Sequence, residues 1–245
     1  MKRIVTTLFG IMFLLSGFGT ALAEGLFKGS NPYFTVEQMP DMTKWLPAPP
    51  AFDSEQFVYD QAQYKWGKGR RADKARAELA ISHASIDPVV ICSHFSEVFG
   101  VEITPENTPH IFRLIVDGME TANNITVKPK GEYQRTRPFT YYNETSLVPD
   151  KEDVLRNNGS YPSGHTVIGT TAALLLSEIN PAAANELIKI GYEYGQSRVI
   201  AGYHWQSDVN ASRFATSVAL AKMHTSERFI KQLKLAKKEF ARKRK

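Results

Sequence analysis

Cysteine is almost absent from this chain, since Cys92 is the one cysteine among 245 residues. A single cysteine allows no intramolecular disulfide, and it cannot build a zinc or iron–sulfur cage that needs several thiolates. The sequence therefore excludes a small scaffold held together by disulfides. A lone cysteine is most often a small buried hydrophobe, which is the role that we expect for Cys92.

Long hydrophobic runs are missing after residue 24. The apolar run over residues 167–176 is only ten residues long and contains Gly169. A helix that spans a bilayer needs about 20 apolar residues, so we expect no stable membrane insertion of the mature chain. With 42% hydrophobic and 22% charged residues, the composition indicates a folded protein with a sizeable core.

Residues 24–230 have no net positive charge, because the excess of basic residues lies in the C-terminal tail. The net charge is +5, but residues 231–245 alone hold eight basic residues and one acid. Because this tail is +7 and residues 1–23 contribute +2, residues 24–230 come to −4. We expect a solvated helix end and no nucleic-acid binding. The alternative is a tail that contacts a nucleic acid or a membrane surface.

The N-terminus has the pattern of an export signal. Two basic residues at positions 2 and 3 precede an uncharged stretch that ends in Ala21-Leu22-Ala23, a small-x-small cleavage sequence. This pattern predicts a signal peptide over residues 1–23, cleaved before Glu24. An uncleaved anchor is the alternative, because 20 uncharged residues could just span a bilayer.

The pattern of apolar residues predicts an all-α fold. Residues 24–52 are proline-rich and aperiodic, and we expect them to form an extended arm or surface loop. Apolar residues then recur at helical spacing, so residues 53–245 are predicted to form a single-domain helical bundle. The expected helices cover residues 54–66, 72–84, 88–99, 108–124, 163–178, 181–200, 205–223 and 226–241, with a polar loop over 139–161.

Three short blocks concentrate residues that suit a phosphate group. They are Lys130 to Arg137-Pro138, then Pro162-Ser163-Gly164-His165, then Ser197-Arg198 to His204 and Asp208. Lys130 supplies a compact charge, while Arg137 and Arg198 supply planar forks that match phosphate oxygens. Ser163 and Gly164 are expected to open a helix, whose first N–H groups favour an anion.

The histidines of these blocks suit nucleophilic and acid–base chemistry. His204 and Asp208 are spaced i, i+4, which predicts that they share one helix face and that the carboxylate holds one ring nitrogen as N–H. The other nitrogen then keeps a lone pair for nucleophilic attack. His165, at the rim of the anion site, could give a proton to a leaving oxygen. Each block alone is more often a cap or a surface ion pair, so this interpretation depends on their combination.

In combination the blocks resemble the signature of the type-2 phosphatidic-acid-phosphatase superfamily. The signature reads Lys, six residues, Arg-Pro; then Pro-Ser-Gly-His; then Ser-Arg, five residues, His, three residues, Asp, and all eleven specified positions match. The superfamily includes bacterial class A non-specific acid phosphatases and vanadium haloperoxidases. Residues 159–165 and 195–208 are similar to the class A enzymes and their periplasmic apyrase relatives.

The resemblance implies a fold, an activity and a site. It implies an all-α bundle of the acid phosphatase type that hydrolyses phosphate monoesters through a phosphohistidine, with broad specificity. His204 would be the nucleophile, Asp208 would orient it, and His165 would be the general acid and base. The phosphate would be bound by Lys130, Arg137, Ser163, Gly164 and Arg198, with no metal ion and no other cofactor.

Two features of the class A enzymes are missing here. Those relatives usually carry two loop cysteines, whereas this chain has no cysteine in residues 145–149 and has Ala201 at the second place. Without these cysteines the chain cannot form the usual loop disulfide, but none of the matching site positions is changed.

Other functions fit the same signature. The nearest is an apyrase-like hydrolase of nucleoside di- and triphosphates. A vanadate-dependent haloperoxidase would use the pocket with His204 as the vanadium ligand, and a non-catalytic oxyanion-binding protein would leave both histidines unused. The expected partners are small phosphate esters, nucleotides among them, and further copies of the chain in a homo-oligomer. The expected location is the periplasm or the secreted fraction.

Overall fold

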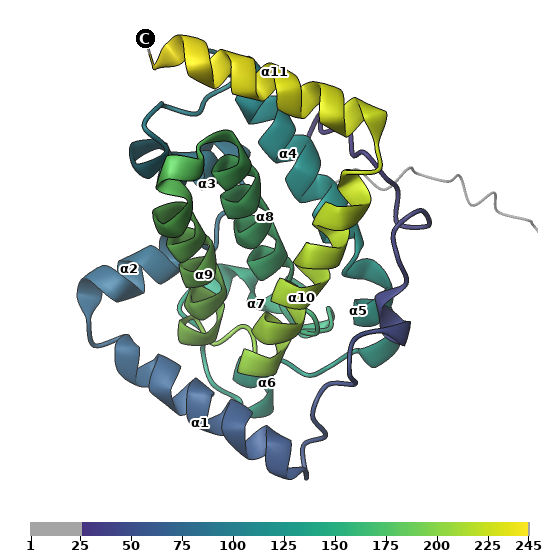
Figure 1. Ribbon diagram of the computed structural model, residues 1–245. Helices are drawn as coiled ribbons and strands as arrows, with labels where there is room; N and C mark the ends of the chain where they lie inside the picture. The colour runs from purple at the N-terminus through teal and green to yellow at the C-terminus, as the bar shows by residue number, and fades with distance from the viewer. Residues whose placement is uncertain (1–25, 245) are drawn as a thin grey trace, which may run out of the picture.

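The helices are arranged around a central one, α8 (Gly164–Ile179). Figure 1 shows α9 (Ala184–Ile200), α4 (Pro109–Asn124) and α10 (Gln206–Met223) packed against it. The computed structural model describes residues 26–244, so the expected signal peptide over residues 1–23 lies outside the described residues. No strand occurs in residues 26–244, and the predicted all-α fold is confirmed.

The other long helices complete the bundle. α1 (Glu55–Arg70) and α2 (Lys74–Ser82) lie against α9, α3 (Pro88–Phe99) contacts both α8 and α9, and α11 (Glu227–Lys243) crosses α4. Shorter elements connect them. These are η1 (Met42–Lys44), α5 (Val127–Tyr133), α6 (Pro138–Tyr141), η2 (Pro149–Lys151), α7 (Glu152–Arg156) and η3 (Pro181–Ala183).

Capping side chains explain where several helices begin. Ser54, Asp73, Asp87 and Ser226 each accept a hydrogen bond from a first-turn N–H, at the starts of α1, α2, α3 and α11. All the helices expected from periodicity are confirmed to within a few residues. The polar loop expected over residues 139–161 is wrong in part, because it contains the end of α6 and all of η2 and α7. Helices of four or five residues are too short to show a helical period.

The segment before α1 is packed into the core, so the surface loop, one of the two forms expected for residues 24–52, is wrong. It is aperiodic, but Phe27, Tyr33, Met39, Met42 and Leu46 are all buried in the main core. Its backbone is held by α4, because acidic and hydroxyl side chains of that helix accept its N–H groups. Leu26 and Phe27 donate to Glu120, Asn31 donates to Asp117, and Tyr33 donates to Thr121, at 2.8 to 3.0 Å.

Helices α8 and α9 approach each other closely because glycines face the interface. A Cβ on Gly169 would lie 2.3 Å from Cγ of Tyr194, and a Cβ on Gly191 would lie 2.6 Å from Cβ of Ala173. Neither distance leaves room for a methyl group. This close packing places the C-terminal end of α9 beside the N-terminal end of α8.

The last helix carries the basic tail on its outer face. Phe229, Leu233, Ala236 and Phe240 of α11 are buried, whereas its lysines and arginines are exposed. Its acid, Glu239, is buried and accepts the backbone N–H of Ile111 at 2.8 Å. Within residues 26–244, no helix combines the length and the apolar character that crossing a bilayer requires.

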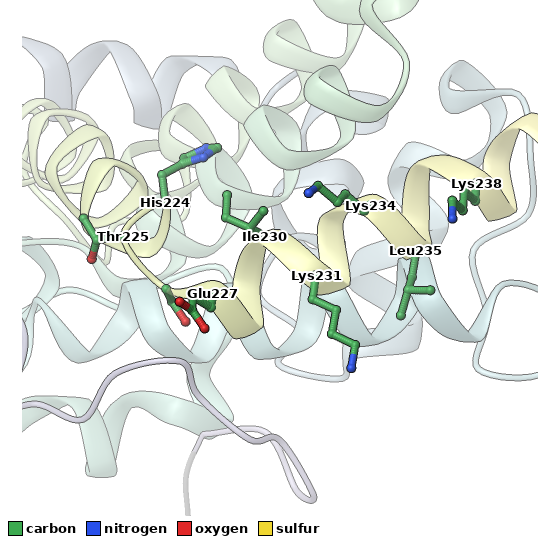
Figure 2. A pocket seen from close by; sticks show the side chains of 9 residues that line it. His224, Thr225, Glu227, Ile230, Lys231, Lys234, Leu235 and Lys238 are labelled. Atoms are coloured by element: carbon green, nitrogen blue, oxygen red, sulfur yellow. The ribbon is translucent and has the colours of Figure 1, made fainter.

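A groove of about 550 Å³ lies at the corner between α10 and α11. Figure 2 shows the side chains that line it, among them His224, Ile230 and Lys234. None of the residues predicted for the phosphate site is among them, so the groove is separate from the chemistry that the sequence indicates.

Candidate active site

The fold brings the three sequence blocks to one place. Ser163 is the N-cap of α8, with Gly164 and His165 in its first turn, and Arg198 lies in the last turn of α9. His204 follows in the loop between α9 and α10, and Asp208 lies in the first turn of α10. Lys130 comes from α5 and Arg137 from the residue before α6. Residues far apart in the chain therefore converge where α8 and α10 begin and α9 ends.

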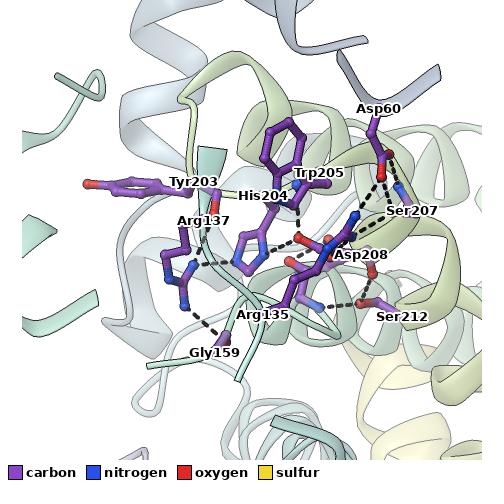
Figure 3. A network of polar contacts seen from close by, with 12 residues as sticks. Asp60, Arg135, Arg137, Gly159, Tyr203, His204, Trp205, Ser207, Asp208 and Ser212 are labelled. Atoms are coloured by element: carbon purple, nitrogen blue, oxygen red, sulfur yellow. Dashed lines mark hydrogen bonds and ion pairs between the residues drawn. The ribbon is translucent and has the colours of Figure 1, made fainter. Parts of the chain in front are cut away.

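His204 lies between an anion and a cation, as Figure 3 shows. Its Nδ1 is 3.3 Å from Oδ2 of Asp208, and its Nε2 is 3.1 Å from Nη1 of Arg137. A guanidinium can only donate, so Nε2 accepts and Nδ1 carries the hydrogen. Desolvation and the charges of Arg137 and Lys130 hold the pKa of His204 well below its usual value, so the ring is neutral.

The predicted placement of His204 on a helix is wrong, although its contact with Asp208 is as predicted. α10 begins at Gln206, and Trp205 is its N-cap residue. The carboxylate of Asp208 accepts the backbone N–H of Trp205 at 2.8 Å, which ties down the start of the helix. The same carboxylate thus caps the helix and holds the histidine that lies just outside it.

Two of the predicted cations, Arg137 and Arg198, are buried at the site, and the third, Lys130, is half-buried. Lys130 donates to the carbonyl of Gly159 at 2.7 Å, and Arg137 donates to the carbonyl of Tyr203 at 3.1 Å. Nε and Nη1 of Arg198 are buried without a hydrogen-bond partner within the described residues. Burial lowers the pKa of Arg137 to about 10 and that of Arg198 to about 9. An anion that entered the site would satisfy these donors and offset their charge.

The start of α8 adds uncharged donors to the same place. The Ser163 hydroxyl accepts from the hydroxyl of Thr166 at 2.9 Å, and the Ser163 N–H donates to the hydroxyl of Ser212 at 2.7 Å. The next N–H groups belong to the first helical turn and have no acceptor within the helix. A Cβ on Gly164 would lie 2.9 Å from Oδ1 of Asn123, so the residue at this turn has to be small.

His165 has different surroundings from His204. Its Nε2 is 3.2 Å from the carbonyl oxygen of Ala84, which can only accept, so Nε2 carries a hydrogen. Desolvation and the charge of Arg198 hold the pKa of His165 well below its usual value. A negative charge beside Arg198 would act in the opposite direction and raise that pKa.

Comparison with known proteins identifies the family. A family model described as the PAP2 superfamily matches residues 115–230, which include all three blocks. The chain is 40% identical to a non-specific acid phosphatase of Providencia stuartii over 246 residues, covering 99% of both chains. The chain belongs to the bacterial non-specific acid phosphatases. A further relative, the non-specific acid phosphatase of Salmonella typhimurium, is 38% identical over 210 residues, covering 85% of this chain and 84% of the relative.

The family assignment makes the protein an enzyme of the phosphatase class, as the sequence resemblance implies. The relatives compared are named acid phosphatases, which does not support the expected closer likeness to apyrases. Within residues 26–244 of the phosphatase, no group of three or more His, Cys, Asp or Glu side chains is arranged to hold a metal ion.

Two buried residues of the phosphatase site were missed from the sequence. Arg135 donates to Oδ1 of Asp208 at 2.6 Å and to Oδ2 of Asp60 at 2.8 Å, and Figure 3 shows it between them. Asp60 lies in α1, outside the three blocks. A signal for it existed, because the spacing of Phe57, Asp60 and Tyr64 places Asp60 on the buried face of its helix.

Proposed function

We propose that this phosphatase hydrolyses phosphate monoesters through a phosphohistidine formed on Nε2 of His204. The supporting observation is the contact of Arg137 with that nitrogen, because it requires a lone pair on Nε2 and leaves the ring hydrogen on Nδ1 facing Asp208. A neutral imidazole held in this tautomer is a nucleophile whose orientation is fixed before the substrate arrives.

In the first half of the reaction, the Nε2 lone pair attacks phosphorus. A P–N bond forms, the bond between phosphorus and the ester oxygen breaks, and His165 gives a proton to the leaving oxygen. The imidazole of His204 becomes positive, and Asp208 stabilises that charge through Nδ1–H. Lys130, Arg137 and Arg198 stabilise the phosphoryl oxygens, together with the hydroxyl of Ser163 and the N–H of Gly164.

In the second half, water attacks phosphorus while the neutral His165 takes its proton. The P–N bond breaks, the lone pair returns to Nε2, and inorganic phosphate leaves. The first half needs His165 protonated although the site lowers its pKa. The charge of the substrate beside Arg198 raises that pKa, so substrate binding takes up a proton, and we expect the best activity on the acid side of neutrality.

Three cations around the phosphate fill the part that Mg²⁺ plays in many phosphoryl-transfer enzymes. We therefore propose turnover that needs no added metal ion and that EDTA leaves unchanged.

The substrate class that we propose is small phosphate monoesters of broad variety, since the relatives compared are named non-specific acid phosphatases. The pattern of residues 1–23 supports action in the periplasm or outside the cell, and a homo-oligomer remains a prediction.

The nucleophile is tested by trapping the intermediate. With ³²P-labelled p-nitrophenyl phosphate and a rapid alkali quench, the wild-type protein should carry alkali-stable, acid-labile label on histidine. His204→Ala should carry none and lose at least about a thousandfold in kcat, because the oriented lone pair on Nε2 is lost. Asp208→Asn should lose about a hundredfold to ten-thousandfold, since an amide can favour the wrong tautomer.

The matched control is His224→Ala, which removes a histidine from the groove of Figure 2 and should keep wild-type kcat and labelling. Stable labelling of the His204→Ala protein would overturn the assignment of the nucleophile.

A further inference from the structure

The carboxylate of Asp208 is held from both sides. Its Oδ2 accepts the N–H of Trp205 at 2.8 Å and faces Nδ1 of His204 at 3.3 Å, while its Oδ1 accepts Nη1 of Arg135 at 2.6 Å. Asp208 and Arg135 are nearly inaccessible, with side chains 0% and 3% exposed. The orientation of the carboxylate toward His204 therefore depends on Arg135 as well as on its own helix.

Arg135 is itself held by a second buried carboxylate. Its Nη2 donates to Oδ2 of Asp60 at 2.8 Å, and its guanidinium carbon lies 5.6 Å from the ring centre of Trp205. Asp60 is 0% exposed and accepts the backbone N–H of Ser207 at 2.8 Å. Arg135 also donates to the Ser207 hydroxyl at 2.7 Å, so Asp60 and Arg135 together hold the residue before Asp208.

We propose that Asp60 and Arg135 are positioning residues, which form with Asp208 a buried ionic triad that orients His204 and sets the charge around it. This inference rests on the proposed role of His204. Burying a carboxylate, a guanidinium and a second carboxylate costs desolvation free energy, and a buried ion pair is weak evidence of a purely stabilising role. A planar fork that bridges two carboxylates is, in contrast, well suited to fixing their geometry.

The triad also adjusts the electrostatics of the nucleophile. The triad as a whole carries one negative charge and stands against the positive side of the site. The charged and titratable groups that face His204 are Lys130 from α5, Arg137 before α6, His165 from α8, Arg198 from α9 and Asp208 from α10, with Arg135 and Asp60 of α1 behind Asp208. Loss of the Asp60 charge leaves His204 in a more positive field, and loss of the Arg135 charge leaves it in a more negative one.

The test uses charge-removing variants with opposite expected effects. The quantity measured is the midpoint of the acidic limb in a plot of kcat for p-nitrophenyl phosphate against pH. Asp60→Asn should lower this midpoint by about 0.5 to 1 pH unit, and Arg135→Gln should raise it by a similar amount. Because the nitrophenolate leaving group needs little protonation, the acidic limb reports the protonation of the nucleophile, His204. The double variant Asp60→Asn/Arg135→Gln should return the midpoint to near the wild-type value while kcat stays about tenfold low or lower.

Arg135→Lys separates geometry from charge, because lysine keeps the charge but cannot bridge both carboxylates as a planar fork. It should leave the midpoint in place and lower kcat about tenfold, with KM little changed. Asp117→Asn is the matched control. Asp117 is a buried aspartate that pairs with Arg113 and accepts the N–H of Asn31, and its substitution should move neither kcat nor the midpoint.

Midpoints that move in the same direction in Asp60→Asn and Arg135→Gln, or that stay fixed in both, overturn the proposal. If Arg135→Gln does not fold, the proposal is overturned when Asp60→Asn leaves the midpoint unchanged and Arg135→Lys keeps wild-type kcat. A histidine ¹⁵N titration of each variant with inorganic phosphate bound gives the pKa of His204 directly. It distinguishes the two proposals, because the pKa of His204 should still shift even if another residue proves to be the nucleophile.

Discussion

At the residue scale, the two site histidines differ in what their Nε2 atoms contact. His204 faces the guanidinium of Arg137, which can only donate, and His165 faces the carbonyl of Ala84, which can only accept. One Nε2 therefore holds a lone pair, and the other holds a hydrogen. This difference supports a division of labour in which His204 attacks and His165 moves protons.

The proposed role of His165 predicts a dependence on the leaving group. An alkyl alcohol needs a proton as it leaves, whereas p-nitrophenolate hardly does. In single-turnover measurements of the phosphorylation step, His165→Ala should therefore lose about a hundredfold more activity on glycerol phosphate than on p-nitrophenyl phosphate.

The control for this experiment is His110→Ala, which lies outside the site and should keep the wild-type ratio between the two substrates. If His165→Ala loses the same factor in activity on glycerol phosphate and on p-nitrophenyl phosphate, His165 positions the phosphate and does not protonate the leaving oxygen.

At the scale of helices, α8 and α9 meet through glycines, and this contact predicts a large effect of one methyl group. Gly169→Ala would place its Cβ 2.3 Å from Cγ of Tyr194. Tyr194 cannot move easily, because it is buried and stacked against His83 and Phe95. We expect a loss of about 1 to 3 kcal/mol in the free energy of unfolding, measured by chemical denaturation.

Gly69→Ala in α1 is the matched control, because a Cβ there would meet nothing within 4 Å. Its free energy of unfolding should equal that of the wild type or exceed it by up to about 1 kcal/mol, since alanine is the better helix former. Equal stabilities of the two variants would show that the interface of α8 and α9 relaxes around the added methyl group.

Also at the scale of helices, sequence reasoning succeeded where an element is long or carries a cap. Ser163 at the start of α8 is a local signal that the structure bears out. α7 could not be found in this way, because its five residues make little more than one turn. The burial of the N-terminal arm was also missed, because its N–H groups bond to Glu120 and Asp117 of α4, which no local pattern reveals.

At the scale of the whole molecule, the predicted site residues were recognised by their spacing, whereas the residues behind them were not. The signature residues lie in three compact blocks, so a pattern along the chain can detect them. Asp60 and Arg135 meet only because α1 packs against the start of α10, and a side-chain pair 75 residues apart leaves no trace in spacing. The sequence could show that Asp60 is on a buried face, but not which cation it meets.

The burial of three histidines makes the stability of the whole fold depend on pH. Burial lowers the pKa of His83 to about 3 and holds the pKa values of His165 and His204 well below their usual value. Above about pH 6.5 these rings are neutral in both the folded and the unfolded chain. As the pH falls below that value, the unfolded chain binds protons that the folded chain does not, so the free energy of unfolding falls.

His83 allows this linkage to be tested outside the phosphate site. Its Nδ1 lies 2.9 Å from the hydroxyl of Ser197, and its ring stacks on Tyr194 with centroids 3.9 Å apart. Between pH 6.5 and pH 5, His83 alone should remove about 2 kcal/mol from the free energy of unfolding. His83→Asn keeps a neutral polar partner for Ser197 but loses the stacking, so it should be less stable at pH 7 and lose less stability on acidification.

The measurement is chemical denaturation of both proteins at pH 7, 6 and 5, with and without inorganic phosphate. Phosphate should stabilise the wild-type protein more as the pH falls, because its charge raises the pKa values of His165 and His204, which both lie beside the cations of the site. It should leave the difference in slope between wild type and His83→Asn largely unchanged, since His83 is held by Ser197 and Tyr194 and not by the phosphate. Parallel slopes for the two proteins would mean that His83 becomes protonated within the folded protein, and that its burial does not oppose the charge.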